Sequence, residues 1–100
     1  MPWSIHWTDN AMNALRELSD SREELAEGLG DKLVREVFAA VGTLARFPYK
    51  APPHPLVRDK ALRRLVIGKH QVAYRASEEA RTITILAVRH ERQRQQDPTE

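Results

Sequence analysis

The sequence predicts a single α+β domain in which a helical hairpin packs on a small, mostly antiparallel four-stranded sheet, in the order β-α-α-β-β-β. Three observations predict this fold: an alternating segment near the N-terminus, a long stretch with helical periodicity, and a final third of alternating segments separated by turn residues. The chain has 100 residues, of which 41% are hydrophobic. That length suffices for one domain, which we expect over residues 1–92, with residues 93–100 as a flexible tail.

The first strand is predicted at residues 3–7. Trp3, Ile5 and Trp7 alternate there with polar residues and would share one face of the strand. Residues 8–10, which are Thr-Asp-Asn, follow with side-chain oxygens that can cap a helix. A strand that leads directly into a helix is therefore expected.

Apolar residues at helical spacing predict two helices before residue 48, and two positions for the break between them remain open. Ser19-Asp20-Ser21 interrupts the first apolar pattern, and Ser21 with Glu24 has the spacing of a capping box, so a second helix can start there. Alternatively, the break lies at Gly28-Leu29-Gly30 and the second helix begins at Asp31. Phe47-Pro48 ends the helix in either case, because the residue before a proline avoids helical backbone angles.

The last half begins with a loop and continues as three strands. Residues 48–55 contain four prolines, which exclude a helix or a central strand. Strands are predicted at residues 65–67, 71–76 and 82–88, with Gly68-Lys69 as a two-residue hairpin loop. The last strand becomes apolar on both faces, which is typical of a central strand.

The charge of the chain is unevenly distributed. The formal net charge is only +2, yet acidic residues crowd into residues 9–36 and basic residues dominate residues 50–94. The second half should therefore carry a positive field, which attracts an acidic partner or a phosphate backbone.

Composition excludes several classes of protein. The chain has no cysteine, which removes disulfides, thiolate nucleophiles and cysteine metal sites. No basic segment followed by an apolar one marks a secretory signal, and no apolar run approaches the roughly 20 residues of a membrane span. Because the four histidines are scattered, no metal site is expected either. We expect a soluble cytoplasmic protein without a cofactor.

The order of elements and four local segments resemble the RelE/ParE superfamily of toxins. The segments are Leu44-Ala45-Arg46-Phe47-Pro48, Arg63-Arg64-Leu65, Val72-Ala73-Tyr74-Arg75 and Ile83-Thr84-Ile85-Leu86-Ala87-Val88-Arg89-His90. The similarity spans roughly residues 3–92. It implies the toxin of a bacterial type II toxin–antitoxin system, neutralised by an antitoxin encoded beside it. The target implied is DNA gyrase for the ParE branch and mRNA on the ribosome for the RelE branch.

A set of basic residues near the strand ends is the candidate site for binding the target or the antitoxin: Arg63, Arg64, Arg75, Arg89, His90 and Arg92. If the strand ends adjoin, Arg63 or Arg64 can clamp a phosphate together with Arg89 and Arg92. His90 can act as an acid or a base, because the pKa of histidine lies near neutrality. The candidate catalytic set of an RNA-cleaving enzyme is therefore Arg63, Arg64, Arg89, His90 and Arg92.

The segment after the fourth strand favours binding over RNA cleavage. Active RelE-type enzymes resemble one another in a tyrosine or histidine a few residues past this strand, whereas residues 91–95 here are Glu-Arg-Gln-Arg-Gln. The leading interpretation is therefore a ParE-like toxin, of the kind associated with plasmid stabilisation, that inhibits growth by binding DNA gyrase and is not an enzyme.

Two alternatives stay open. The first is a ribosome-dependent mRNA interferase that uses the candidate catalytic set. The second is a degenerate, non-toxic member that only binds its antitoxin. All three interpretations require a cognate antitoxin, which should be acidic or amphipathic where it meets the basic strand ends.

Overall fold

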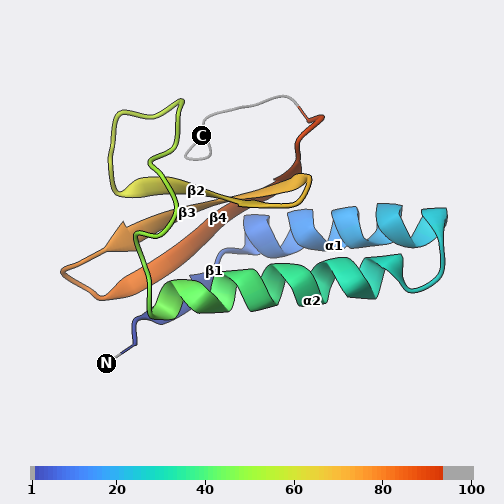
Figure 1. The fold of residues 1–100 in the computed structure, drawn as a ribbon, viewed down its shortest axis with the longest axis horizontal. Coiled ribbons are helices and arrows are strands. Elements are labelled where there is room, and N and C mark those ends of the chain that lie inside the picture. Colours follow the sequence, from blue (N-terminus) through green and yellow to red (C-terminus); the bar gives the residue numbers. More distant parts are fainter. Residues whose placement is uncertain (1, 94–100) are drawn as a thin grey trace.

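A helical hairpin lies along one face of a four-stranded mixed sheet in residues 2–93, the part of the chain that this computed structural model describes (Figure 1). The elements follow the predicted order, with a short 3-10 turn after the second helix: β1 Ser4–Trp7, α1 Asp9–Leu25, α2 Leu29–Gly42, η1 Thr43–Ala45, β2 Leu62–Ile67, β3 His70–Ser77 and β4 Thr82–His90. The α+β fold class is confirmed. Residues 94–100 of the expected tail lie outside the described residues.

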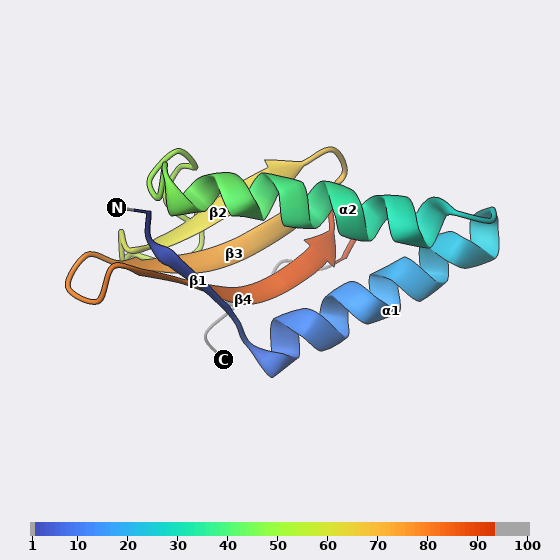
Figure 2. The same ribbon diagram turned by 90° about the horizontal axis from the view of Figure 1, so that it is seen from below.

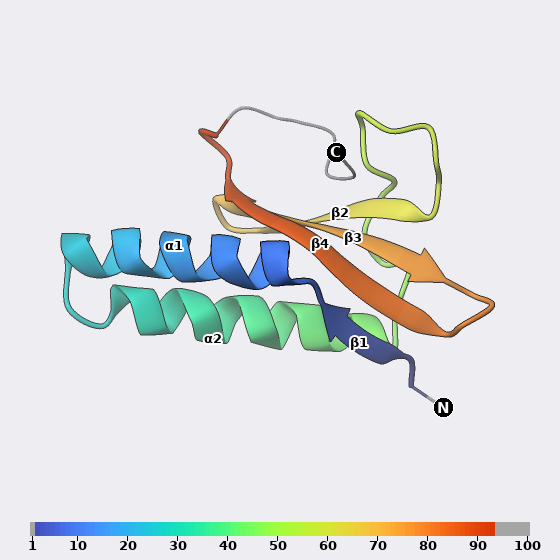
Figure 3. The same cartoon turned by 180° about the vertical axis from the view of Figure 1, so that it is seen from behind.

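The sheet has the strand order β1-β4-β3-β2. β1 pairs with β4 in parallel, and the other two pairings are antiparallel. The predicted central position of the last strand is confirmed, because β4 lies between β1 and β3 (Figure 3). Ile67 pairs with His70, which leaves Gly68-Lys69 as a two-residue loop, and Gly68 has the positive φ of 58° that favours glycine there.

The break between the helices lies at residues 26–28, so of the two open positions the new helix at Ser21 is wrong. The break lies close to Gly28-Leu29-Gly30, but α2 begins at Leu29, two residues before Asp31. Residues 19–21 lie inside α1, whose backbone continues through these polar residues. The Glu23 carboxylate, and not that of Glu24, caps the second helix by accepting hydrogen bonds from the backbone N–H groups of Gly28 and Gly30, each at 2.9 Å. These two bonds also lower the pKa of Glu23.

The two helices approach each other closely at Gly30. A Cβ atom at this position would lie 2.5 Å from the backbone oxygen of Ser19 and 2.8 Å from its hydroxyl. Glycine is therefore required here by space and not by an unusual backbone angle. This close approach explains why glycine follows the helix break directly.

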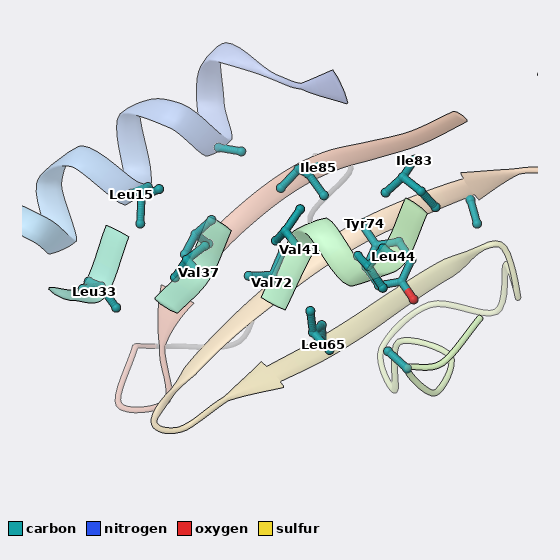
Figure 4. Packing of buried hydrophobic residues seen from close by; sticks show 14 residues of the cluster. Leu15, Leu33, Val37, Val41, Leu44, Leu65, Val72, Tyr74, Ile83 and Ile85 are labelled. Carbon is teal, nitrogen blue, oxygen red and sulfur yellow. The ribbon is translucent and has the colours of Figure 1, made fainter. Parts of the chain in front are cut away.

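The core lies between the helical hairpin and the sheet (Figures 2 and 4). Its largest fully buried side chains come from both layers: Val37 and Val41 from α2, Leu44 from η1, Val72 and Tyr74 from β3, and Ile83 and Ile85 from β4. Apolar residues every three or four positions along α2 and every two positions along β3 and β4 produce this arrangement. Among residues 2–93, no helix is long and apolar enough to cross a membrane.

Besides the helix break, several element ends differ from the predicted ones, three of them by more than one residue. α2 ends at Gly42 and the 3-10 turn ends at Ala45, so the helix stops before Phe47-Pro48. β2 begins at Leu62, three residues earlier than predicted, because residues 62–64 pair with residues 73–75 of β3. The proline-rich loop also pairs with the outer edge of β2: the His54 N–H donates to the Leu62 carbonyl at 2.8 Å and the Arg64 N–H to the Pro52 carbonyl at 3.1 Å. β4 continues to His90 by pairing with His70.

Candidate functional site

The alternation of side chains divides the candidate residues between the two faces of the sheet. Arg63 pairs with Tyr74, and His70 pairs with His90, on the face that the helices cover. Arg64, Gln71, Arg75 and Arg89 fall on the opposite face, which we call the open face. Residues that are adjacent in sequence, such as Arg63 and Arg64, therefore have different surroundings.

Arg64 and Arg89 form the positive centre of the open face. Arg89 donates one guanidinium hydrogen bond to the side-chain oxygen of Gln71, its register partner on β3, and another to the backbone oxygen of Gln93 at 2.9 Å. Partial burial, and then the nearby charge of Arg64, lower the pKa of Arg89. Two guanidinium groups on the same face of the sheet create a positive potential that favours a phosphate or a carboxylate.

Arg63 lies on the helix-covered side and holds the proline-rich loop. Its guanidinium donates to the Ala51 carbonyl at 2.6 Å and lies 4.8 Å from the centre of the Tyr49 ring. Its register partner Tyr74 donates its hydroxyl to the Pro48 carbonyl at 2.8 Å. Burial raises the pKa of the Tyr74 hydroxyl. The two side chains together fix residues 48–51 against the sheet.

Arg75 holds the other end of the same loop. Its guanidinium forms an ion pair with Asp59, whose carboxylate also accepts the Ala61 N–H at 2.9 Å. The hydrogen bond from Arg75, followed by the one from Ala61, lowers the pKa of Asp59. Arg75 thus lies on the open face but is engaged with a neighbour.

His90 lies on the helix-covered side, away from Arg89. Its ring packs edge-on against His70 with the centroids 5.1 Å apart. Its Nδ1 atom accepts the backbone N–H of Arg92 at 3.0 Å, and its backbone N–H donates to the side chain of Gln93 at 2.8 Å. Arg92 is exposed in the turn after β4. The structure therefore brings Arg64, Arg75 and Arg89 to one face and separates them from Arg63 and His90.

A pocket that sequence reasoning missed lies between the helical hairpin and the β2–β3 turn. Its volume is about 140 Å³, and it is lined by Arg22 of α1, the first two turns of α2 and residues 67–70. The hairpin turn was predictable from Gly68-Lys69, but its packing against the helices depends on tertiary structure. Among the side chains of residues 2–93, no group of His, Cys, Asp and Glu is placed to hold a metal ion.

The fold is that of toxins from bacterial toxin–antitoxin pairs. A chain of the toxin–antitoxin complex RelBE2 from Mycobacterium tuberculosis is similar at 26% identity and a TM-score of 0.64, over 90% of this chain and 99% of that one. A chain of the chromosomal ParDE system from P. aeruginosa has 20% identity and a TM-score of 0.72, over 88% and 95%. A doubly substituted E. coli toxin RelE in the free state has 16% identity and a TM-score of 0.56, over 92% and 86%.

The sequence assigns the chain more narrowly than the fold does. Residues 5–95 match the family of the ParE toxin of the type II toxin–antitoxin system parDE, and the chain belongs to this family. No curated protein matches it. The resemblance to the RelE/ParE superfamily is thereby confirmed.

Proposed function

We propose that this ParE-family protein inhibits bacterial growth by binding DNA gyrase and is neutralised by a cognate antitoxin. The observation that carries the proposal is the division of the basic residues by the sheet. Arg64 and Arg89 share the open face, whereas the imidazole of His90 lies on the face that the helices cover. The open face thus has the positive charge that binding an acidic surface requires. The imidazole of His90 does not lie beside these arginines.

Among residues 2–93, the groups that RNA cleavage requires are not all present on the open face, which supports binding as the primary activity. Attack by a ribose 2′-hydroxyl needs a base, an acid for the leaving oxygen and cations beside the phosphate. Arg64 and Arg89 can supply the cations. His90 is on the wrong side of the sheet to supply the proton transfer at the same phosphate, and its Nδ1 atom already accepts the N–H of Arg92.

A supercoiling assay tests the proposed target. Purified protein should inhibit supercoiling by DNA gyrase in a dose-dependent way, and Arg64→Ala and Arg89→Ala should each weaken this inhibition. Lys60→Ala is the matched control, because Lys60 is an exposed cation of the proline-rich loop. Unchanged supercoiling at saturating protein would exclude gyrase as the target.

The location of Arg64 and Arg89 on one face of the sheet also favours a second candidate, a ribosome-dependent mRNA interferase. Two guanidinium groups can hold one phosphate in a bidentate manner. Primer extension on transcripts from expressing cells should then reveal cuts within codons, and intact transcripts during growth arrest would exclude this activity. Growth that continues on expression alone would instead indicate a member that only binds its antitoxin.

The proposed partner is the product of the adjoining gene. Two of the similar structures are toxin–antitoxin systems, and the positive open face suits an acidic segment. Co-expression of the adjoining gene should restore growth, and the two proteins should purify as a complex. DNA gyrase acts in the cytoplasm, so the proposal also implies a cytoplasmic protein.

A further inference from the structure

The pocket between the helical hairpin and the β2–β3 turn lies away from the open face. Figures 1 and 2 show that the β2–β3 turn, at one end of the sheet, lies next to the helical hairpin. His70 forms part of the wall and is only 6% exposed. The pocket is therefore a second surface, separate from the one formed by Arg64 and Arg89.

The charge around this pocket is positive. Three cations line it, Arg22 from α1, Lys32 from α2 and Lys69 from the turn, against one anion, Glu36. Glu36 faces Lys32 across one helical turn, at 3.9 Å. That contact leaves the positive charges of Arg22 and Lys69 without an opposite charge among the groups that line the pocket. An incoming group should therefore carry negative charge.

Apart from Gly68 and His70, the remaining lining is apolar, and it limits the kind of group that fits. Leu29 and Leu33 of α2 and Ile67 of β2 line the pocket together with the cations. A pocket of about 140 Å³ has room for one small side-chain group. A chain of methylene groups that ends in a carboxylate matches both the size and the mixed lining.

We propose that this pocket receives a glutamate side chain of the antitoxin, with its methylene groups against Leu33 and Ile67 and its carboxylate near Arg22 and Lys69. The inference rests on the proposed function, because it takes the antitoxin as the partner. A glutamate fits better than an inorganic phosphate, since its methylene groups can contact the apolar residues of the lining and a phosphate has none. A charge that is anchored beside apolar contacts contributes specificity as well as affinity.

The test compares two charge reversals by isothermal titration calorimetry with the purified product of the adjoining gene. Lys69→Glu should weaken binding by about tenfold or more, because it places a carboxylate where the partner's carboxylate would lie. Lys60→Glu makes the same change of charge on an exposed loop residue outside the pocket and should leave the dissociation constant unchanged within about twofold. Lys69→Gln, which removes only the charge, should have an intermediate effect.

A charge exchange then identifies the residue on the partner. Each glutamate of the antitoxin is changed to lysine in turn, and each variant is titrated against Lys69→Glu. One pair should recover most of the lost affinity, because the reversed charges attract again. Unfolding midpoints equal to that of the unmodified protein show that the variants are folded.

The outcomes separate this inference from the proposed function. If the unmodified protein does not bind the antitoxin, the proposed partnership fails. If it binds, and Lys69→Glu binds as tightly as Lys60→Glu, the pocket inference is overturned while the partnership stands. Failure of every glutamate reversal to recover affinity would overturn it as well.

Discussion

His70 and His90 face each other across β3 and β4, with their ring centroids 5.1 Å apart and their planes at 89°. The Nε2 atom of His70 is buried and has no hydrogen-bond partner within residues 2–93. Burial, and then the charges of His90 and Arg22, lower the pKa of His70, while Glu36 and Glu91 oppose the shift. Protonation of this histidine therefore disfavours the folded state.

This relationship predicts a loss of stability in mild acid. The unfolded chain binds a proton at His70 near pH 6.5 and the folded protein binds it only at lower pH, so unfolding takes up protons in between. Stability should be complete above pH 6.5 and fall as the pH drops below that value. Urea unfolding at pH 7.5, 6.0 and 5.0 measures the decline.

A glutamine substitution isolates the contribution of His70. His70→Gln cannot take up a proton, so its stability should decline less steeply than that of the unmodified protein over the same pH range. His6→Gln is the control, because His6 is exposed on β1. Equal declines for His70→Gln and the unmodified protein would contradict the prediction.

The hydroxyl of Tyr74 should contribute measurably to stability. Tyr74 is completely buried, and its hydroxyl donates to the Pro48 carbonyl. Tyr74→Phe keeps the ring but removes the donor, which should cost about 1–2 kcal/mol of unfolding free energy. Chemical unfolding at neutral pH measures this loss.

Tyr49→Phe is the matched control for Tyr74→Phe. Tyr49 is 40% exposed and contacts Trp3 and Arg63 through its ring, which phenylalanine retains. Its effect should stay within about 0.5 kcal/mol, as is usual for exposed positions. A cost for Tyr49→Phe equal to that for Tyr74→Phe would remove the special role of the buried hydroxyl.

The sequence predicted the architecture because each element has a strong local pattern. The alternation at residues 3–7 and 71–76 and the apolar stripe from Leu33 to Val41 lie where the structure buries them. The helix break was harder to predict, because it depends on Glu23 reaching forward to the N–H groups of Gly28 and Gly30. A capping contact across seven residues leaves no local pattern.

The candidate residues were predictable as a set but not in their arrangement. Basic character near the strand ends is visible in the sequence, yet the face on which Arg63 or Arg64 lies depends on strand register. β2 begins earlier than its apolar segment suggests, because residues 62–64 also pair with β3. The pocket beside Lys69 depends on the packing of helices against a turn, which no spacing of residues predicts.

Two glycines of α2 have different surroundings, and we therefore predict opposite effects when each is replaced by alanine. Gly30→Ala places a methyl group 2.5 Å from the Ser19 oxygen and should destabilise the protein by about 1–3 kcal/mol. Gly42 ends α2 with helical angles, φ −56° and ψ −31°, and a methyl group there meets nothing within 4 Å. Gly42→Ala should therefore stabilise the protein by about 0.5–1 kcal/mol.

Thermal unfolding of the two glycine variants checks both signs in one experiment. The midpoint should fall for Gly30→Ala and rise for Gly42→Ala, relative to the unmodified protein. A small or favourable effect of Gly30→Ala would contradict the close contact between Gly30 of α2 and Ser19 of α1.

Two adjacent arginines should give different phenotypes. Arg63→Ala removes the hydrogen bond to the Ala51 carbonyl and the contact with Tyr49, and it should cost about 1.5–3 kcal/mol of unfolding free energy. Arg64→Ala removes a charge from the open face and should abolish most of the growth inhibition at an unchanged level of folded protein.

Induced expression in liquid culture, with unfolding of the purified variants in parallel, separates the two effects. Cultures that express Arg64→Ala should grow. The unfolding free energy of the purified variant should lie within about 1 kcal/mol of that of the unmodified protein. Growth inhibition by Arg64→Ala equal to that of the unmodified protein would exclude the open face as the target-binding surface. Binding would then have to involve another surface, such as the exposed Phe47 and Leu56 of the proline-rich loop, which are 62% and 51% exposed.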